Sequence, residues 1–181
     1  MLPASRGLAC SKGCTHCCHQ QVSVTPLEAL ELANGLRRTH EPAALAVLTE
    51  RVRVGATKVR GLSAPQHRHR CPLVQEDGSC AAYDSRPLLC RGSNSFDVDA
   101  CAQTGAPIPT YLELADAAQD AQEQLDAECL RLSGREQMLE LTCALLIALE
   151  DPTAEARWHE GQPVFDAAAH SWFESGVLRH W

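Results

Sequence analysis

The clearest periodic pattern of apolar residues lies between residues 110 and 132. Apolar side chains recur there every three or four positions and acidic side chains occupy the remaining faces, which is typical of a helix with one buried face. The apolar stripe consists of Leu114, Ala118, Ala121, Leu125, Cys129 and Leu132. Ser133-Gly134 follows directly and is a helix-ending signal. We therefore predict a helix over 110–132.

A second pattern, over residues 135–150, predicts a helix that is apolar nearly all round, with Met138, Leu139, Leu141, Leu145, Leu146, Ile147 and Leu149. A helix that is apolar on all sides is normally buried, so we expect this helix at the centre of the molecule. Weaker helical patterning follows at 155–159 and 164–174, in the segment that also carries the three tryptophans, Trp158, Trp172 and Trp181.

Two more helices are predicted in the first half of the chain. Thr25, Pro26 and Glu28 combine an N-cap, a proline in the first turn and the acidic partner of a capping box, which together indicate a helix start. A further helix fits residues 42–59. The fold class is therefore mainly α.

Residues 61–109 show no period, because proline and glycine interrupt every candidate pattern. A structureless run of this length is unusual inside a compact domain, but metal ligation can supply the missing order. We predict a small helical domain with a long irregular cysteine-bearing segment stapled by metal. Residues 1–109 would form the cysteine-cluster region and 110–181 the helical support and C-terminal tail, as one continuous domain.

The chain holds ten cysteines, and seven of them stand in two groups. Four fall within nine residues and three follow at wide intervals: Cys10, Cys14, Cys17, Cys18, Cys71, Cys80 and Cys90. A chain of 181 residues can bury a sufficient core without disulfides, so the cysteines indicate metal or redox chemistry. Thiolates suit zinc, iron–sulfur clusters or Cu(I), and we predict that at least four of the seven are direct ligands.

Four thiolates complete either a tetrahedral zinc site or a cubane cluster. Cys17 and Cys18 are adjacent, so both cannot point comfortably at one small ion, and one of them faces a second centre, a supporting role or the core. Either assembly carries a formal charge of about −2. Arg86 and Arg91 lie near the thiols in sequence and could compensate that charge.

These residues resemble a known family. The sequence Cys-x₃-Cys-x₂-Cys-Cys from Cys10, then Cys71-Pro72-Leu73, then Cys80-x-x-Tyr83-Asp84-x-Arg86-Pro87-x-x-Cys90-Arg91 is similar to the YkgJ-type CxxCxxCC cysteine-cluster family, described as zinc- or iron-chelating domains. The resemblance covers roughly residues 10–91. Relatives in that family include flagellin lysine methylases that hold a [4Fe–4S] cluster, so the resemblance implies metal binding and favours iron–sulfur, while the second half of this chain matches no methylase feature.

The spacing of Cys10, Cys14 and Cys17 also matches the radical-SAM cluster motif. Those enzymes need a strand before the motif and repeated βα units after it, and neither is predicted here. Cys129 and Cys143 lie on apolar helical stripes, so we expect them to pack in the core. The sequence does not decide whether Cys101 is an eighth ligand or a loop thiol.

The net charge of −7 is unevenly distributed. Residues 1–110 carry 12 Lys and Arg against 9 Asp and Glu, whereas residues 111–181 carry 4 against 14, so the second half is unsuited to nucleic acid. No signal-peptide-like or membrane-spanning run is found, and we expect a cytoplasmic protein without a membrane partner. A protein partner and the oligomeric state are left open.

No phosphate loop, GxSxG, HExxH or EF-hand motif is present, so the sequence does not decide whether the protein is an enzyme. Three functions are open: an iron–sulfur protein with a redox or group-transfer role, a zinc-binding structural or interaction module, and a metal-delivery protein. Seven thiols exceed what one structural zinc needs. We therefore favour an iron–sulfur cluster, [4Fe–4S], with zinc as the alternative cofactor.

Overall fold

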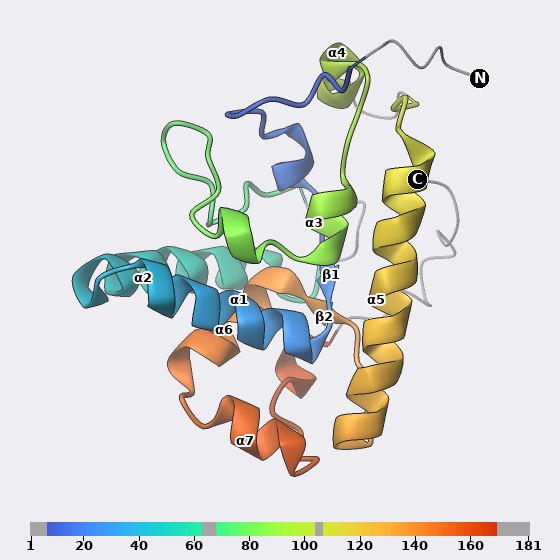
Figure 1. Cartoon of the computed structure of the whole chain (residues 1–181). Helices are drawn as coiled ribbons and strands as arrows, with labels where there is room; N and C mark the ends of the chain where they lie inside the picture. The colour runs from blue at the N-terminus through green and yellow to red at the C-terminus, as the bar shows by residue number, and fades with distance from the viewer. Residues whose placement is uncertain (1–6, 63–67, 104–106, 170–181) are drawn as a thin grey trace.

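The computed structural model describes residues 7–62, 68–103 and 107–169 (Figure 1). It is mainly helical, as predicted, with a single two-stranded antiparallel sheet in the described residues. The elements in chain order are the 3-10 turn η1 (His16–His19), β1 (Ser23–Val24), α1 (Pro26–Thr39), α2 (Pro42–Val59), η2 (Tyr83–Ser85), α3 (Leu88–Gly92), α4 (Val98–Ala102), α5 (Leu112–Ser133), β2 (Leu139–Glu140), α6 (Leu141–Glu150), α7 (Ala154–His159) and η3 (Asp166–Ala168).

The predicted capping box at the start of α1 is confirmed. The Glu28 backbone N–H donates to the Thr25 hydroxyl at 3.1 Å, and the Thr25 N–H donates to the Glu28 carboxylate at 2.9 Å. Each side chain thereby satisfies a backbone donor that a helix start leaves free. The helix predicted over 42–59 is also confirmed, because α2 has these bounds.

The helix predicted over 135–150 begins later than expected. Its first predicted residues include β2, in which Leu139 pairs with Val24 and Glu140 with Ser23. The N–H of Leu141 also donates to the Val22 carbonyl at 3.1 Å. These backbone groups bond to β1, so α6 begins only at Leu141. The apolar run over 135–150 could not separate a buried strand from a buried helix.

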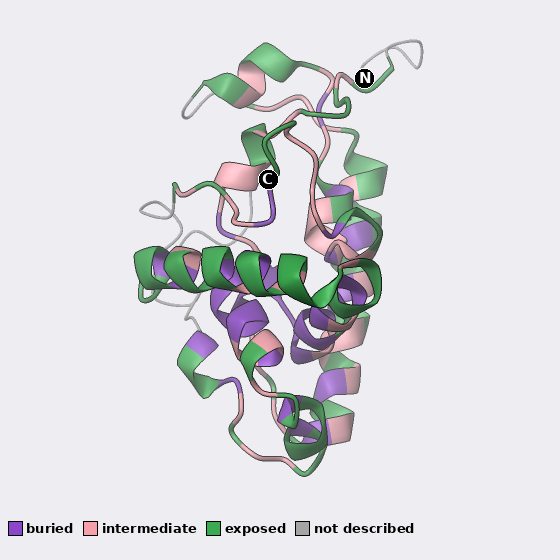
Figure 2. Ribbon diagram, turned by 90° about the vertical axis from the view of Figure 1, so that its left-hand side faces the viewer, coloured by how far each residue is buried: buried purple, intermediate pink, exposed green. Residues whose placement is uncertain are grey.

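Helix α6 lies at the centre of the core, as predicted, and packs mainly against α1 and α2. All of its residues from Leu141 to Leu146 are buried. Figure 2 shows the buried ribbon gathered on these central helices. The largest fully buried apolar side chains of the described residues are Trp158, Phe165, Leu32, Leu36, Leu139, Leu145, Val24 and Val52. Trp172 and Trp181 lie outside the described residues.

Helix α5 confirms the prediction for 110–132, but its packing differs from a simple core helix. It lies mainly against the short helix α3, at a point where a Cβ on Gly92 would come within 2.5 Å of the Ala118 side chain. The buried face includes the polar Gln122, whereas Leu114 of the predicted stripe is 38% exposed. The amide of Gln122 is needed inside because it donates to the Ser23 carbonyl at 3.0 Å.

The cysteine-bearing segment is less irregular than predicted, because η2, α3 and α4 lie within it. Each of these elements has at most five residues, so none could be recognised from periodicity. The helix predicted over 155–159 is confirmed by α7. Of the pattern at 164–174, the described part forms only the short turn η3, and residues 170–174 lie outside the described ranges. None of the helices within the described ranges combines the length and apolar character that crossing a bilayer demands.

Candidate metal centre

A short hairpin brings Cys71 and Cys80 beside the N-terminal cysteine segment. Its two arms are joined where the Ala81 N–H donates to the Leu73 carbonyl at 2.8 Å, and Val74 forms a bridge with Cys80. The N–H of Cys71 donates to the carbonyl of Cys18 at 2.8 Å. The backbone thus joins cysteines that are more than fifty positions apart in sequence.

The tip of the hairpin rests directly on the N-terminal segment. Gly78 has a φ of +80°, a conformation that residues with a side chain rarely adopt. A Cβ at this position would lie 2.7 Å from the Gly13 carbonyl oxygen and 2.9 Å from its Cα. Glycine is therefore required here both for the turn and for the close approach of the two segments.

Helix α3 carries Cys90 and is positioned by the buried carboxylate of Glu28. That carboxylate accepts a hydrogen bond from the Leu88 backbone N–H at 2.8 Å, at the start of α3. Gln122 donates to it at 3.5 Å from α5. The capping residue of α1 therefore also fixes the helix that presents Cys90.

Five of the predicted cysteines, from three segments of the chain, lie close enough to influence one another's ionisation. Burial and, to a smaller extent, the charges of Cys80, Glu140 and Cys17 raise the pKa of Cys71 to about 12. Burial likewise raises the pKa of Cys90 and Cys80. Crowded thiols of this kind keep their protons until a cation replaces them.

The adjacent cysteines Cys17 and Cys18 are coupled by a hydrogen bond between their side chains. The bond raises the pKa of Cys17 and lowers that of Cys18, so the Cys17 thiol donates to the Cys18 sulfur. The charges of Cys71, Cys90 and Cys80 raise the pKa of Cys18, but by less than the hydrogen bond lowers it. Cys18 therefore belongs with the three distant cysteines.

In the described part of the chain, no three His, Cys, Asp or Glu side chains already converge as the ligands of one metal ion would. The backbone brings the thiols into one region, but their side chains do not converge on one point. The donor set nevertheless fits a soft metal, because zinc and iron–sulfur centres are both ligated by four cysteines. Ligation would require rotation of the side chains and loss of their protons.

Arg86 faces the cysteine cluster from the turn before α3. Its positive charge lowers the pKa of Cys17, Cys80 and Cys90, in each case as a smaller contribution than the effects that raise it. The guanidinium lies over the Tyr83 ring at 3.9 Å from the centroid. The aromatic face thus helps to hold a cation near the thiols.

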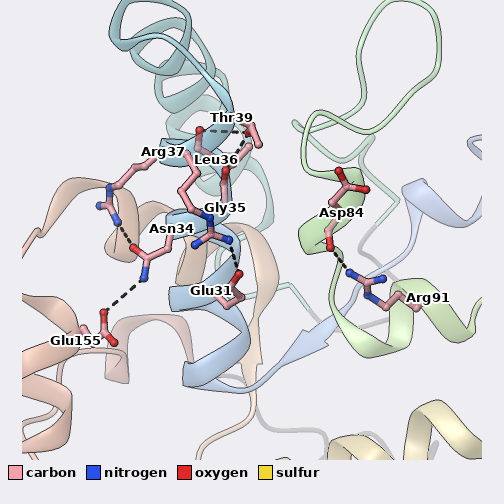
Figure 3. Close-up of polar contacts among 10 residues, drawn as sticks. Glu31, Asn34, Gly35, Leu36, Arg37, Thr39, Asp84, Arg91 and Glu155 are labelled. Carbon is pink, nitrogen blue, oxygen red and sulfur yellow. Dashed lines mark hydrogen bonds and ion pairs between the residues drawn. The ribbon is translucent and has the colours of Figure 1, made fainter.

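Arg91 has different contacts (Figure 3). Its guanidinium donates to the Asp84 carbonyl. It also donates to the Arg86 carbonyl at 2.7 Å. These bonds close the turn that carries Arg86, because they join α3 back to the residues of η2. The compensation of thiolate charge by Arg91 itself stays a prediction.

Cys10 and Cys14 lie near Cys101, whose role the sequence left open. The pKa of Cys10 is raised by burial, lowered by a hydrogen bond from the Ser95 backbone N–H, and raised by the charges of Cys14, Cys17 and Cys101. The Ala9 N–H also donates to the Ser95 carbonyl at 2.8 Å. Cys101 stands eleven residues after Cys90 and has no flanking motif, so the sequence gives no signal that it belongs to the cluster. Its position near Cys10 is what groups it with the other clustered cysteines.

The remaining two cysteines confirm the prediction of core packing. Cys129 and Cys143 are 1% and 3% exposed and belong to the main hydrophobic core. All ten cysteines are free thiols.

Of three comparisons with known proteins, one found a match. A comparison with curated proteins and another with solved structures found no significant match. A family model described as "CxxCxxCC: Putative zinc- or iron-chelating domain" matches residues 9–129. This range includes the eight clustered cysteines and extends through most of α5, well beyond the cysteine pattern itself. The chain therefore belongs to the CxxCxxCC family of zinc- or iron-chelating domains.

Proposed function

We propose that the protein holds an iron–sulfur cluster, of the [4Fe–4S] type, through its clustered cysteines. The observation that carries this proposal is that the backbone brings three cysteine-bearing segments together: the Cys71 N–H donates to the Cys18 carbonyl at 2.8 Å, and the Glu28 carboxylate holds the start of α3, which carries Cys90. At least four direct ligands would come from the set Cys10, Cys14, Cys17, Cys18, Cys71, Cys80 and Cys90. Such a cluster would supply one-electron redox chemistry or a site for group transfer.

Several residues would serve the cluster without ligating it. Arg86 would offset part of its negative charge, and hydrogen bonds and charges around an iron–sulfur cluster tune its potential. Arg91 would keep the turn of Arg86 closed and contribute positive charge. Glu28 would maintain the position of Cys90 through its bond to the Leu88 N–H.

A zinc-binding structural or interaction module is the second candidate, because four thiolates serve zinc equally well. The segment around the thiols has little regular structure, which a structural zinc would stabilise. Its elements are short, and much of its order depends on isolated turn hydrogen bonds. A metal-delivery protein would use the same thiols but would release its metal readily to a chelator.

The wider predictions fit the same proposal. Ten free thiols suit a reducing compartment such as the cytoplasm. The acidic second half disfavours nucleic acid as a partner. We also infer that residues 1–109 and 110–181 form one continuous domain, because Leu73 and Ala82 belong to the same core cluster as Leu145.

The absorption spectrum of protein purified without oxygen tests the proposal. We expect a brown sample whose broad visible absorption bleaches with dithionite, because iron–sulfur charge-transfer bands disappear on reduction. Cys71→Ser should remove the absorption, while Cys143→Ala, a core cysteine outside the cluster, should retain it. A colourless protein that holds only zinc, even after reconstitution with iron and sulfide, would contradict the cluster and favour the zinc module.

A further inference from the structure

A cavity of about 390 Å³ lies between α2 and the start of the hairpin that carries Cys71. This volume is within the range of small-molecule binding sites in proteins. The α2 wall includes Arg51, Val54, Gly55 and Lys58, which recur every three or four positions and therefore share one face of the helix. Residues 69–72 form the opposite wall.

Gly55 allows the two walls to meet at the base of the cavity. A Cβ at this position would lie 3.2 Å from the Pro72 ring and 3.2 Å from the methyl group of Thr142, so a larger residue would push the segments apart. Val59 and Val74 are buried and also line the cavity. The base of the cavity is therefore closely packed and largely apolar.

The charged side chains around the cavity are mainly basic. Arg51, Lys58 and Arg70 line it, and Glu50 is the one acidic side chain among the described residues that do so. The Glu50 carboxylate is paired with Arg53, which lies outside the lining. An excess of positive charge therefore remains, and a cleft lined by charges of one sign attracts the opposite sign.

The two arginines of the cavity are held in place by neutral partners. The Arg51 guanidinium donates to the Pro72 carbonyl at 2.8 Å, and the Arg70 guanidinium donates to the Gln75 carbonyl at 2.7 Å. A guanidinium has five N–H donors, so one such bond positions the group and leaves other donors for an anion. By contrast, Arg53 of the same helix is bonded to two carboxylates.

We propose that this cavity binds a small organic anion, whose carboxylate or phosphate group contacts Arg51, Lys58 and Arg70. Arginine binds both groups through paired hydrogen bonds, and lysine adds a point charge. The apolar base would receive a short carbon chain. Cys71 lines the same cavity, so the anion would lie beside a residue of the proposed metal centre. Its binding depends on the charges of the cavity and not on the identity of the metal.

Calorimetric titration of the full chain, purified without oxygen, with butyl phosphate tests this site. Wild-type protein should bind it, and added salt should weaken the binding. Lys58→Gln should weaken it about tenfold, because a hydrogen bond between charged groups is lost. Lys12→Gln is the control, since it removes the same charge outside the cavity. Butyrate and inorganic phosphate, titrated separately, distinguish a carboxylate from a phosphate ligand, and neutral butanol should not bind.

Val54→Glu gives an independent test. Val54 lines the cavity and is 45% exposed, so the substitution should leave the fold intact, which circular dichroism would verify. The new carboxylate should repel the anion and weaken binding by about tenfold or more. Val47→Glu is the matched control, because Val47 is exposed on the same helix and lies outside the lining.

The outcomes separate this site from the proposed cluster. The anion site would be overturned if butyl phosphate did not bind at millimolar concentration, if butanol bound equally well, or if Val47→Glu and Val54→Glu weakened binding equally. None of these results affects the cluster, which the absorption spectrum tests. A colourless zinc protein that binds butyl phosphate would instead overturn the cluster and support the anion site.

Discussion

The central helices and the cysteine region are ordered by different forces. In α1, α2 and α6 the side chains of Leu36, Val52 and Leu145 are fully buried, and burial of apolar area is the main stabilising contribution in a folded protein. The cysteine region has few such residues. Between positions 68 and 103, the buried apolar side chains are those of Leu73, Val74, Ala82 and Pro87, and Figure 2 shows mostly intermediate and exposed ribbon there.

The difference indicates what each region needs in order to remain folded. We expect the helices, with their buried apolar side chains, to remain folded without a ligand. The cysteine region depends on turns, on the contact of Gly78 with Gly13 and on the Glu28 bond to Leu88. A segment with so little apolar burial is expected to open more readily than the core. Metal ligation would supply the missing stabilisation.

Removal of metal should have the largest effect, because ligation by cysteines can contribute about 10 kcal/mol or more to folding. After chelation we expect amide exchange in residues 71–92 to accelerate by about tenfold or more, while α6 keeps its protection. Hydrogen exchange followed by mass spectrometry measures both regions in one sample. Equal exchange with and without metal in residues 71–92 would remove the distinction between the regions.

Leu145→Ala tests the opposite region. The side chain is fully buried in α6, so its truncation should reduce the free energy of unfolding by about 2–5 kcal/mol. Leu130→Ala is the matched control, because Leu130 is 46% exposed on α5 and the change there should be within about 0.5 kcal/mol. Urea denaturation of metal-free protein gives both values, and a similar cost for the two substitutions would contradict the packing of α6.

Gly78→Ala should disturb the contact between the hairpin and the N-terminal segment. The new Cβ would lie 2.7 Å from the Gly13 carbonyl, and overpacking of this kind costs about 1–3 kcal/mol. Gly61→Ala is the control, since Gly61 has a φ of +76° but no atom within 4 Å of the added Cβ. It should show only the backbone cost of about 1–2 kcal/mol.

Metal affinity separates the two glycine variants. We expect Gly78→Ala to bind zinc more weakly than the wild type, because the thiols on either side of the contact move apart. Gly61→Ala should bind zinc as the wild type does. Competition with a chromophoric chelator measures the affinities, and equal affinity for both variants would show that the close contact does not serve the metal site.

Asp126→Asn should have the smallest effect and a defined pH dependence. Burial and, to a smaller extent, the charges of Glu28, Glu136 and Glu123 raise the pKa of this half-buried carboxyl from 3.8 to about 6. The folded state therefore binds a proton more tightly than the unfolded state, so wild-type stability falls as the pH rises from 3.8 to about 6. The substitution should stabilise the protein above that pH by about 1 kcal/mol, allowing for solvent screening.

The gain should disappear below pH 3.8, where the carboxyl is protonated in both states. Thermal melts across this range check the sign. Asp116→Asn, on an exposed turn of the same helix, is the control. A constant advantage of Asp126→Asn at every pH would show that helix propensity, and not ionisation, is responsible.

Local patterns were sufficient to predict most of the helices. The Thr25–Glu28 capping box, the α2 bounds and the end of α5 at Gly134 depend on residues within a few positions of one another. The cysteine spacing also identified the family, because its motif is local to three short segments. Such features can be recognised from sequence because their energetics are largely local.

Tertiary contacts decided what each of these residues does. Glu28 is predicted as a cap, yet its second oxygen fixes Leu88 and thus Cys90. Gln122 is buried among apolar residues because Ser23 offers a carbonyl to its amide, and residues 139–140 form a strand because β1 lies beside them. The grouping of Cys101 with Cys10 likewise arises from backbone bonds at Ser95. Each of these partners is far away in sequence, so periodicity and spacing carry no information about them.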